Sequence, residues 1–272
     1  AAAAGIANPA GLHPGLFPFQ KHIATWALRQ GKAAVFSGCG TGKSAMAIEW
    51  AWAVSRHTDK PVMIFTPLAV APQFVREGEH LGRRIKHVRE PADMFDGARI
   101  VVTNYERLDK FEQTIRSLGG VVIDESSILK NFAGATRSAL IRAFADTPYR
   151  LSCSATPSPN DTIELCNQAE FLGVIKRSEM LANWFVNDGE TTRAWRLKRH
   201  AEKDFWRWCA TWAIACALPS DIGYDDTGYE LEPIAVHEHI VDVDAQMAEQ
   251  AGLLFAYEAT TLSDQRAVRR AS

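Results

Sequence analysis

The sequence has no long apolar run and no closely spaced pair of cysteines, and each absence excludes a class of protein. No apolar run reaches the roughly 18 residues needed to cross a bilayer. Residues 1–5 lack the basic and apolar regions of a signal peptide. We therefore expect a cytoplasmic protein without a membrane partner. The five cysteines are scattered and form no C-x-x-C pair, which favours reduced thiols over disulfides or a metal site.

The total charge is nearly balanced, at −2 for 272 residues. A balanced total does not by itself indicate a nucleic-acid partner, so only a local patch could support one. Residues 193–207 are rich in Arg and Lys, whereas residues 219–272 are strongly acidic. The basic segment is therefore the part of the chain whose charge could attract a nucleic acid.

Up to about residue 172, short apolar runs alternate with longer segments of helical spacing. The apolar runs are nearly continuous, which is typical of strands buried on both faces of a parallel sheet. The expected strands are residues 33–36, 62–66, 100–103, 121–124 and 150–154, and the expected helices are residues 20–30, 43–56, 71–81, 107–118, 136–145 and 161–171. This alternation predicts an α/β fold with helices on both faces of a parallel sheet. Ligands of such sheets bind beyond the carboxyl ends of the strands.

Residues 37–44 read Ser-Gly-Cys-Gly-Thr-Gly-Lys-Ser and lie between an expected strand and an expected helix. This context predicts a phosphate-binding loop, because glycines let successive backbone N–H groups point inward at a helix N-terminus. Ser37 stands where the usual first glycine of the motif would be, and the alternative is a glycine-rich turn with a chance Gly-Lys-Ser. The expected ATP-binding residues of the loop are Gly38, Gly40, Thr41, Gly42, Lys43 and Ser44.

The expected strand 121–124 ends in two acidic residues, Asp124 and Glu125. At the tip of a strand beside the phosphate loop, Asp124 could hold Mg²⁺ together with Ser44. Glu125 could polarise the water that attacks the γ-phosphate, since phosphoryl transfer depends on positioning and charge stabilisation. We therefore predict catalytic roles for Glu125, Lys43 and Asp124.

Six segments, in this order, resemble the motifs of one family. They are residues 16–20, 37–44, 66–68, 102–106, 124–127 with 129–131, and 152–157. Over residues 16–172 the chain resembles the first RecA-like lobe of a superfamily-two helicase or translocase, most closely the Swi/Snf-type and phage-encoded relatives. The resemblance implies a RecA-like P-loop lobe that uses ATP and Mg²⁺ and moves on a nucleic acid, with DNA favoured over RNA.

The resemblance also assigns roles to single residues. Gln20 would contact the adenine edge. Pro67, Thr103 and Asn104 would lie against the nucleic-acid backbone. The Ser-Ala-Thr motif would couple the ATP site to the track, through Ser154, Ala155 and Thr156.

The chain departs from the family pattern in two respects. Ser127 stands where many relatives carry a His that links the second motif to the third, and a serine hydroxyl could make a similar hydrogen bond. A second RecA-like lobe, which supplies arginine fingers in this family, is absent from the sequence. Such arginines contribute ~10³–10⁵ in rate in comparable enzymes. We therefore expect residues 1–272 to bind ATP but to hydrolyse it poorly, as part of a longer protein that carries the second lobe in cis.

Four parts are expected along the chain. They are a disordered or tag-like leader at 1–15, the ATP-binding lobe at 16–172, a Trp/Arg-rich helical insertion at 173–218, and an acidic connector toward the second lobe at 219–272. In the insertion, Phe205, Trp208, Cys209 and Trp212 have the spacing of one apolar helix face. The candidate nucleic-acid contacts are Arg193, Arg196, Lys198 and Arg199, and the alternative is a solvated face of an amphipathic helix.

Two other functions remain open at this level. A nucleotide-gated module that grips DNA or a protein without efficient hydrolysis would share the ATP site, although the intact Glu125 argues against it. A P-loop kinase of a small molecule would need a lid and a substrate pocket in place of the Ser-Ala-Thr motif. The Trp-rich segment and residues 219–223 resemble phage proteins, which indicates the cytoplasm of a bacterium or of a phage-infected host.

Overall fold

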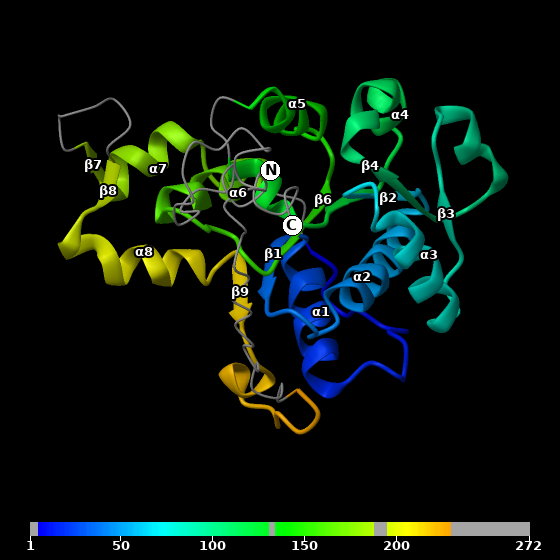
Figure 1. The fold of residues 1–272 in the computed structure, drawn as a ribbon, viewed down its shortest axis with the longest axis horizontal. Coiled ribbons are helices and arrows are strands. Elements are labelled where there is room, and N and C mark those ends of the chain that lie inside the picture. The colour runs from blue at the N-terminus through cyan, green and yellow to red at the C-terminus, as the bar shows by residue number, and fades with distance from the viewer. Residues whose placement is uncertain (1–4, 131–133, 188–194, 230–272) are drawn as a thin grey trace, which may run out of the picture. The chain divides into compact units, whose positions relative to one another are not determined.

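The computed structural model describes residues 5–130, 134–187 and 195–229 (Figure 1). Its main sheet has seven parallel strands in the order β3-β4-β2-β5-β6-β1-β9. The strands are β1 Lys32–Ser37, β2 Val62–Thr66, β3 Ile85–His87, β4 Ile100–Asn104, β5 Gly120–Ile123, β6 Tyr149–Ser154 and β9 Ala213–Cys216. A separate antiparallel hairpin is formed by β7 Phe185–Asn187 and β8 Trp195–Leu197.

Helices cover both faces of the sheet because successive side chains of each buried strand point to opposite faces. Ala33 and Val35 of β1 belong to one apolar cluster, and Ala34 and Phe36 belong to the other. The first cluster is shared with α1 Pro18–Gln30, α2 Lys43–Thr58 and α3 Ala71–His80. The second is shared with α5 Ala135–Ala143, α6 Leu165–Leu172, α7 Arg177–Trp184 and α8 Glu202–Cys209, and with the short α4 Glu112–Ile115.

The predicted α/β fold is confirmed, and all five expected strands are present within two residues of their expected bounds. Two of the expected helices are shorter than predicted. The segment 107–118 consists of a 3₁₀ helix, Tyr105–Phe111, followed by α4, and the segment 161–171 begins with a 3₁₀ turn before α6. These differences lie at helix starts, where propensity alone sets the boundary poorly.

The expected boundary at residue 172 is wrong for the sheet, because β9 pairs in parallel with β1 (Figure 1). Residues 173–218 are also not wholly helical, since they contain the β7–β8 hairpin. β9 has only a weak signal in the sequence, because it is four residues long and lies at the edge of the sheet with only Cys216 buried. The expected apolar face of α8 is confirmed by the buried Phe205 and Cys209.

The described part of the expected leader, residues 5–15, packs against the lobe. The backbone N–H of Ile6 donates to the carbonyl of Leu28 at the end of α1 (2.8 Å). The N–H of His13 donates to the carboxylate of Glu49 (2.6 Å). These contacts satisfy polar groups at a helix end and on a buried acid, so the expectation of a disordered leader is wrong for this stretch.

Glu49 anchors α2, the helix that follows the candidate phosphate loop. Its carboxylate is fully buried and forms a two-pronged ion pair with Arg83, whose Nε and Nη2 lie 2.7 and 3.0 Å from the two carboxylate oxygens. The guanidinium also lies 4.7 Å from the ring centre of Trp52. A buried charge is tolerated only where it is paired and hydrogen-bonded in this way. The pair therefore fixes α2 relative to the loop before β3.

Candidate nucleotide site

The predicted phosphate-binding, acidic and Ser-Ala-Thr residues lie at or just after the carboxyl ends of three strands that follow one another in the sheet, β5, β6 and β1. The loop after β1 leads into α2, and the loops after β5 and β6 carry the acidic pair and the Ser-Ala-Thr motif. All three loops leave the sheet at the same edge because the strands are parallel. The edge of the sheet thus gathers segments that lie more than a hundred residues apart in the sequence.

The loop 37–44 has the backbone geometry that its glycines were expected to supply. Gly40 and Gly42 have φ angles of 81° and 82°, in the left-handed region that other residues rarely adopt. The Thr41 hydroxyl donates to the Gly38 carbonyl (2.8 Å), and it also contacts the Ser37 hydroxyl. Ser37, which replaces the usual glycine, is thus buried inside the loop and helps to hold its shape.

Lys43 is the first residue of α2, and its ammonium group turns back into the loop. Nζ donates to the carbonyl groups of Ser37 and Gly38, both at 2.8 Å. The half-buried Ser44 follows it in the first turn of the helix. A cation and free backbone N–H groups at a helix N-terminus form an anion-binding site.

Asp124 follows β5 directly and is 6% exposed. Its carboxylate accepts a hydrogen bond from the Thr66 hydroxyl (3.0 Å), and its carbonyl accepts one from the Tyr105 hydroxyl. Burial raises the pKa of Asp124 to about 6 and the Glu125 charge adds to this, whereas the Thr66 bond and the Lys43 charge oppose it. Asp124 and Lys43 follow β5 and β1, which are separated in the sheet by β6.

Glu125 differs from Asp124 in both exposure and backbone conformation. Its side chain is exposed, and its φ of 52° is unusual for a residue with a side chain. Strained backbone of this kind persists where the surrounding structure enforces it, often at functional positions. The Asp124 side chain is thus buried at the end of β5, whereas the Glu125 side chain is exposed to solvent.

The residues present fit a bound Mg²⁺. A buried carboxylate whose pKa is raised by desolvation is stabilised by a cation, and Mg²⁺ commonly takes one or two protein oxygens together with water and phosphate. Asp124, directly after β5, and the Ser44 hydroxyl, in the first turn of α2, could supply such oxygens.

Gln20 is buried between the start of α1 and the phosphate loop. Its Nε2 donates to the Thr41 carbonyl (3.0 Å), and its Oε1 accepts the backbone N–H of Phe17 (3.0 Å). A Cβ at Gly42 would lie 2.3 Å from Nε2, so only glycine leaves room for this contact. The structure places Gln20 against the loop, and its contact with adenine stays a prediction.

The Ser-Ala-Thr motif follows β6 at the same edge. Ser154 is buried and its hydroxyl accepts the N–H of Thr156 (3.0 Å), while Thr156 is exposed and Ala155 is half-buried. The structure links the second and third motifs through Gln168 of α6, which sequence reasoning missed. Gln168 accepts from the Ser152 hydroxyl (2.5 Å) and donates to the Ser126 carbonyl (3.0 Å).

Thr66 and Tyr105 were also missed as partners of Asp124. Thr66 is the last residue of β2, the strand next to β5, and Tyr105 directly follows β4, the strand beyond β2. Their position at the sheet edge was the only available signal. A polar side chain at the carboxyl edge of the sheet can point toward the candidate nucleotide site as well as toward solvent.

Two of the three candidate contacts to a nucleic-acid backbone are not on the surface. Thr103 is fully buried within β4, and Asn104 is 3% exposed. The amide of Asn104 donates to Glu106 and accepts from Arg107 Nε (2.8 Å). The prediction that these two side chains offer a contact surface is therefore wrong. Pro67, the third candidate, is half-buried beside the exposed Leu68.

The basic candidates after residue 192 have different surroundings. Arg193 lies outside the described residues. Arg196 is exposed on β8, which is a strand and not the expected helix. Lys198 donates through Nζ to the carbonyls of Ala182 and Asn183 at the end of α7, and Arg199 is exposed. Lys198 thus caps a helix, whereas Arg196 and Arg199 face outward.

Comparison with known families agrees with this geometry. The sequence matches the DEAD/DEAH box helicase family over residues 17–165, which is more than half of the chain. The chain belongs to this family. The match covers the phosphate loop, the acidic pair and the Ser-Ala-Thr motif, so the helicase-type nucleotide site of the family and the site described above are the same part of the chain.

Solved structures show the same fold for this helicase domain. The SWI2/SNF2 ATPase core of Sulfolobus solfataricus in complex with dsDNA matches with a TM-score of 0.63 and 17% identity, over 77% of this chain and 46% of that one. The SWI2/SNF2 ATPase core domain of the same organism matches with a TM-score of 0.61 and 18% identity, over 77% and 45%. The chain therefore spans less than half the length of these two proteins.

A third solved structure is more distant. The UvsW helicase from Bacteriophage T4 matches with a TM-score of 0.49 and 15% identity, over 59% of this chain and 58% of that one, a likeness too weak to support a conclusion. No curated protein matches the sequence.

Proposed function

We propose that this helicase-family chain is the ATP-binding lobe of a DNA translocase or helicase, and that it couples ATP hydrolysis to movement on DNA. The observation that carries the proposal is the strand order β5-β6-β1, which puts the acidic pair, the Ser-Ala-Thr motif and the phosphate loop at one edge of the parallel sheet. A P-loop site of this composition is suited to phosphoryl transfer.

Each residue has a defined part in this proposal. Lys43 and the loop amides bind the phosphates, and Ser44 with Asp124 holds the Mg²⁺ that neutralises phosphate charge when bound. Glu125, exposed next to the buried Asp124, orients and deprotonates the attacking water. Gln20 contacts the adenine edge, and Ser154, Ala155 and Thr156 transmit the nucleotide state to the track.

A second RecA-like lobe in cis is part of the proposal. The chain spans 46% and 45% of the two SWI2/SNF2 proteins that share its fold. In comparable enzymes an arginine finger supplied from outside the phosphate site contributes ~10³–10⁵ in rate. We therefore expect residues 1–272 to bind ATP and to hydrolyse it slowly.

The proposed polymer is DNA, because the resemblance of the motifs is to translocases of duplex DNA. The exposed Arg196 and Arg199, with Pro67 and the exposed Leu68, are the remaining surface candidates. Resemblance of the Trp-rich segment to phage proteins supports a setting in the cytoplasm of a bacterium or of a phage-infected host. In the part of the chain that the structure describes, every helix is too short or too polar to cross a membrane.

Phosphate release measured with duplex DNA, single-stranded DNA and RNA tests the proposal, on residues 1–272 and on a longer protein that includes the second lobe. We expect stimulation by DNA in the longer protein and little turnover by residues 1–272. Glu125→Gln should reduce turnover by about 100-fold or more, with ATP affinity within about twofold of wild type.

Three results would contradict parts of this proposal. Fast DNA-stimulated turnover by residues 1–272 would remove the need for a second lobe. Stimulation by RNA alone would mean that the protein moves on RNA and not on DNA. ATP binding without polymer-stimulated turnover in the longer protein would favour the nucleotide-gated binding module.

A further inference from the structure

A cavity of about 770 Å³ lies at the amino ends of β2, β5 and β6. Lys60 precedes β2, Leu118 precedes β5 and Thr147 precedes β6, so the loops before three neighbouring strands form part of its lining. Because the strands are parallel, these loops lie at the edge of the sheet opposite to the candidate nucleotide site. The cavity is therefore separate from that site.

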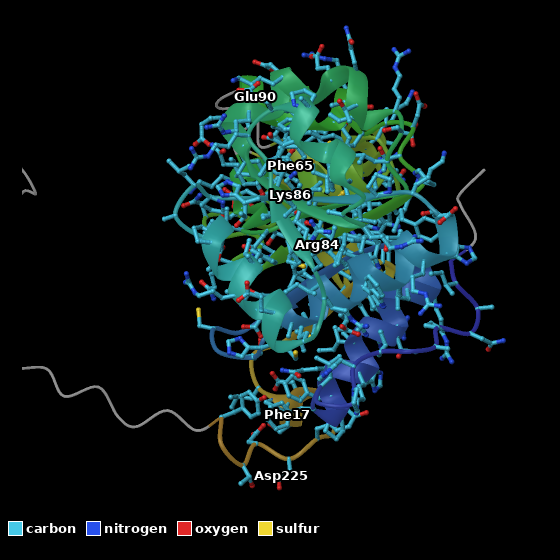
Figure 2. All side chains as sticks on the ribbon, turned by 90° about the vertical axis from the view of Figure 1, so that its right-hand side faces the viewer. Phe17, Phe65, Arg84, Lys86, Glu90 and Asp225 are labelled. Atoms are coloured by element: carbon cyan, nitrogen blue, oxygen red, sulfur yellow. The ribbon has the colours of Figure 1, made fainter. Side chains whose placement is uncertain are left out.

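The cavity has an apolar floor on one face of the sheet. Ile115 and Leu118 line it, and both are buried in the apolar cluster that the sheet shares with α4 and α5. Figure 2 shows the two faces of the lobe, with Glu90 on the face of α4 and Phe17 on the face of α1. The floor can thus support the carbon skeleton of a ligand on the face of the sheet that does not carry α1.

Hydrogen bonds hold the walls of the cavity in place. The N–H of Gly119 donates to the carbonyl of Pro61 (2.9 Å), which joins the loop before β5 to the loop before β2. A Cβ at Gly119 would lie 2.1 Å from the hydroxyl oxygen of Thr58, so a glycine lets the two loops meet. The buried Arg150 donates through Nε to the carbonyl of Thr147 (3.0 Å) in the loop before β6. The three loops therefore form a preformed cavity.

Charged side chains surround the apolar floor. Lys60, Arg116 and Arg142 are positive, Glu112 and Asp146 are negative, and all five are exposed. They come from the loop before β2, from α4 and the residue after it, and from α5 and the loop that follows. Within the described part of the chain, none of these five side chains forms an ion pair or a hydrogen bond. The charges are therefore available to a ligand.

The mixture of charges selects a class of ligand. A guanidinium group binds phosphate through two parallel N–H bonds, and two arginines from different elements can enclose one phosphate group. The carboxylates of Glu112 and Asp146 can accept hydrogen bonds from hydroxyl groups, whereas they would repel a ligand that is anionic along its whole length. A volume of about 770 Å³ lies within the range of small-molecule sites.

We propose that this cavity is a second binding site, which takes a small phosphate ester that carries hydroxyl groups. Arg116 and Arg142 bind the phosphate group, and Lys60 adds positive charge beside it. Glu112 and Asp146 accept hydrogen bonds from the hydroxyl groups, while the apolar floor contacts the carbon atoms. The inference does not depend on the proposed function, because it uses no residue of the nucleotide site.

Calorimetric titration of residues 1–272 with ribose 5-phosphate tests this site, and ribose serves as the same sugar without phosphate. The wild type should bind ribose 5-phosphate at least about tenfold more tightly than ribose. Arg116→Gln and Arg142→Gln remove the charge, and each should raise the dissociation constant for ribose 5-phosphate by about tenfold, the effect of one lost charge-assisted hydrogen bond. Arg142→Lys keeps the charge without the planar fork and should weaken binding by only about threefold.

Two further variants locate the bound phosphate. Arg76→Gln removes an exposed arginine of α3, on the other face of the sheet, and should leave the affinity for ribose 5-phosphate unchanged. Lys43→Ala disables the phosphate loop at the opposite edge of the sheet and should leave this affinity unchanged as well. Thermal unfolding of every variant shows whether the fold is intact.

Four results would overturn the inference. They are the absence of binding by the wild type at millimolar ribose 5-phosphate, unchanged affinity in both Gln variants, loss of binding in Lys43→Ala alone, and displacement of the bound ester by duplex DNA. The third would place the ester in the loop 37–44, and the fourth would assign the cavity to a polymer.

Discussion

The carboxyl edge of the sheet has two halves that differ in what they expose. On the half formed by β1, β5 and β6, Glu125 lies beyond the end of β5 and Lys43 is the first residue of α2. On the half formed by β2 and β4, Thr103 and Asn104 are the last two residues of a strand and are buried. Lys43 and Glu125 thus lie beyond the sheet, whereas Thr103 and Asn104 lie within it.

The two halves also differ in how their polar groups are satisfied. Asp124 and Lys43 are charged groups at the same edge of the sheet, whereas the Asn104 side chain is hydrogen-bonded to Glu106 and Arg107. The half with β1, β5 and β6 therefore carries the charged candidate groups, whereas Thr103 and Asn104 of the other half are buried in the lobe. Four substitutions can break or sharpen this contrast.

The largest effect is expected for Lys43→Ala. Loss of the ammonium removes charge-assisted hydrogen bonds to phosphate, so the dissociation constant of Mg-ATP should rise by about 100-fold in calorimetric titration. Lys60→Ala is the matched control, because this exposed lysine lies in the loop before β2 at the opposite end of the strands. Unchanged ATP affinity in Lys43→Ala would mean that the loop does not bind phosphate.

A smaller effect is expected for the stability of Asp124→Asn. In the unfolded chain the Asp124 carboxyl ionises near pH 4, whereas burial raises its folded pKa to about 6. The folded state therefore loses stability as pH rises through this interval. Asn has no such penalty and keeps an oxygen for the Thr66 hydroxyl. Without metal, the variant should be more stable than wild type by about 1–3 kcal/mol at pH 8, and the gain should vanish below about pH 4.

Urea unfolding in the presence of a chelator measures this difference. Glu125→Gln is the control, since this exposed carboxylate should change stability by less than about 0.5 kcal/mol. If Asp124→Asn is instead less stable than wild type at pH 8, the buried Asp124 carboxylate is already stabilised by the groups around it.

The smallest effects concern the candidate contacts to a polymer. Arg199 is exposed, and Arg199→Ala should weaken DNA binding a few-fold and lower the salt dependence by about one counterion. Thr103→Val should leave DNA affinity unchanged, because the side chain is buried. Its hydroxyl has no hydrogen-bond partner among the described residues, so the substitution should stabilise the fold by up to about 1 kcal/mol. A loss of DNA affinity in Thr103→Val would contradict the conclusion that this buried side chain offers no contact to DNA.

The sequence allowed the backbone geometry of the loop 37–44 and most of the sheet to be predicted, for a physical reason. Gly40, Gly42 and Lys43 act through local backbone geometry, which short motifs encode directly. The five predicted strands are buried on both faces, and their continuous apolar runs are a strong signal.

The remaining features depend on contacts between distant segments. β9 has too few residues and too little burial to be recognised before it is placed beside β1. The same applies to Tyr229, which meets Phe17 only because the chain returns after β9, and to residues 5–15, whose polar groups find partners in α1 and α2. Contacts of this kind between distant segments leave no pattern in the local sequence.

Gln168 has a mechanical consequence for the lobe. Its side chain holds the Ser126 carbonyl after β5 and the Ser152 hydroxyl in β6 at the same time. A shift of either strand end is therefore passed to α6, which lies outside the nucleotide site, and from there to the other strand. α6 thus supports both strand ends at once. A change in its packing would alter the positions of both strand ends, although the helix itself lies outside the nucleotide site.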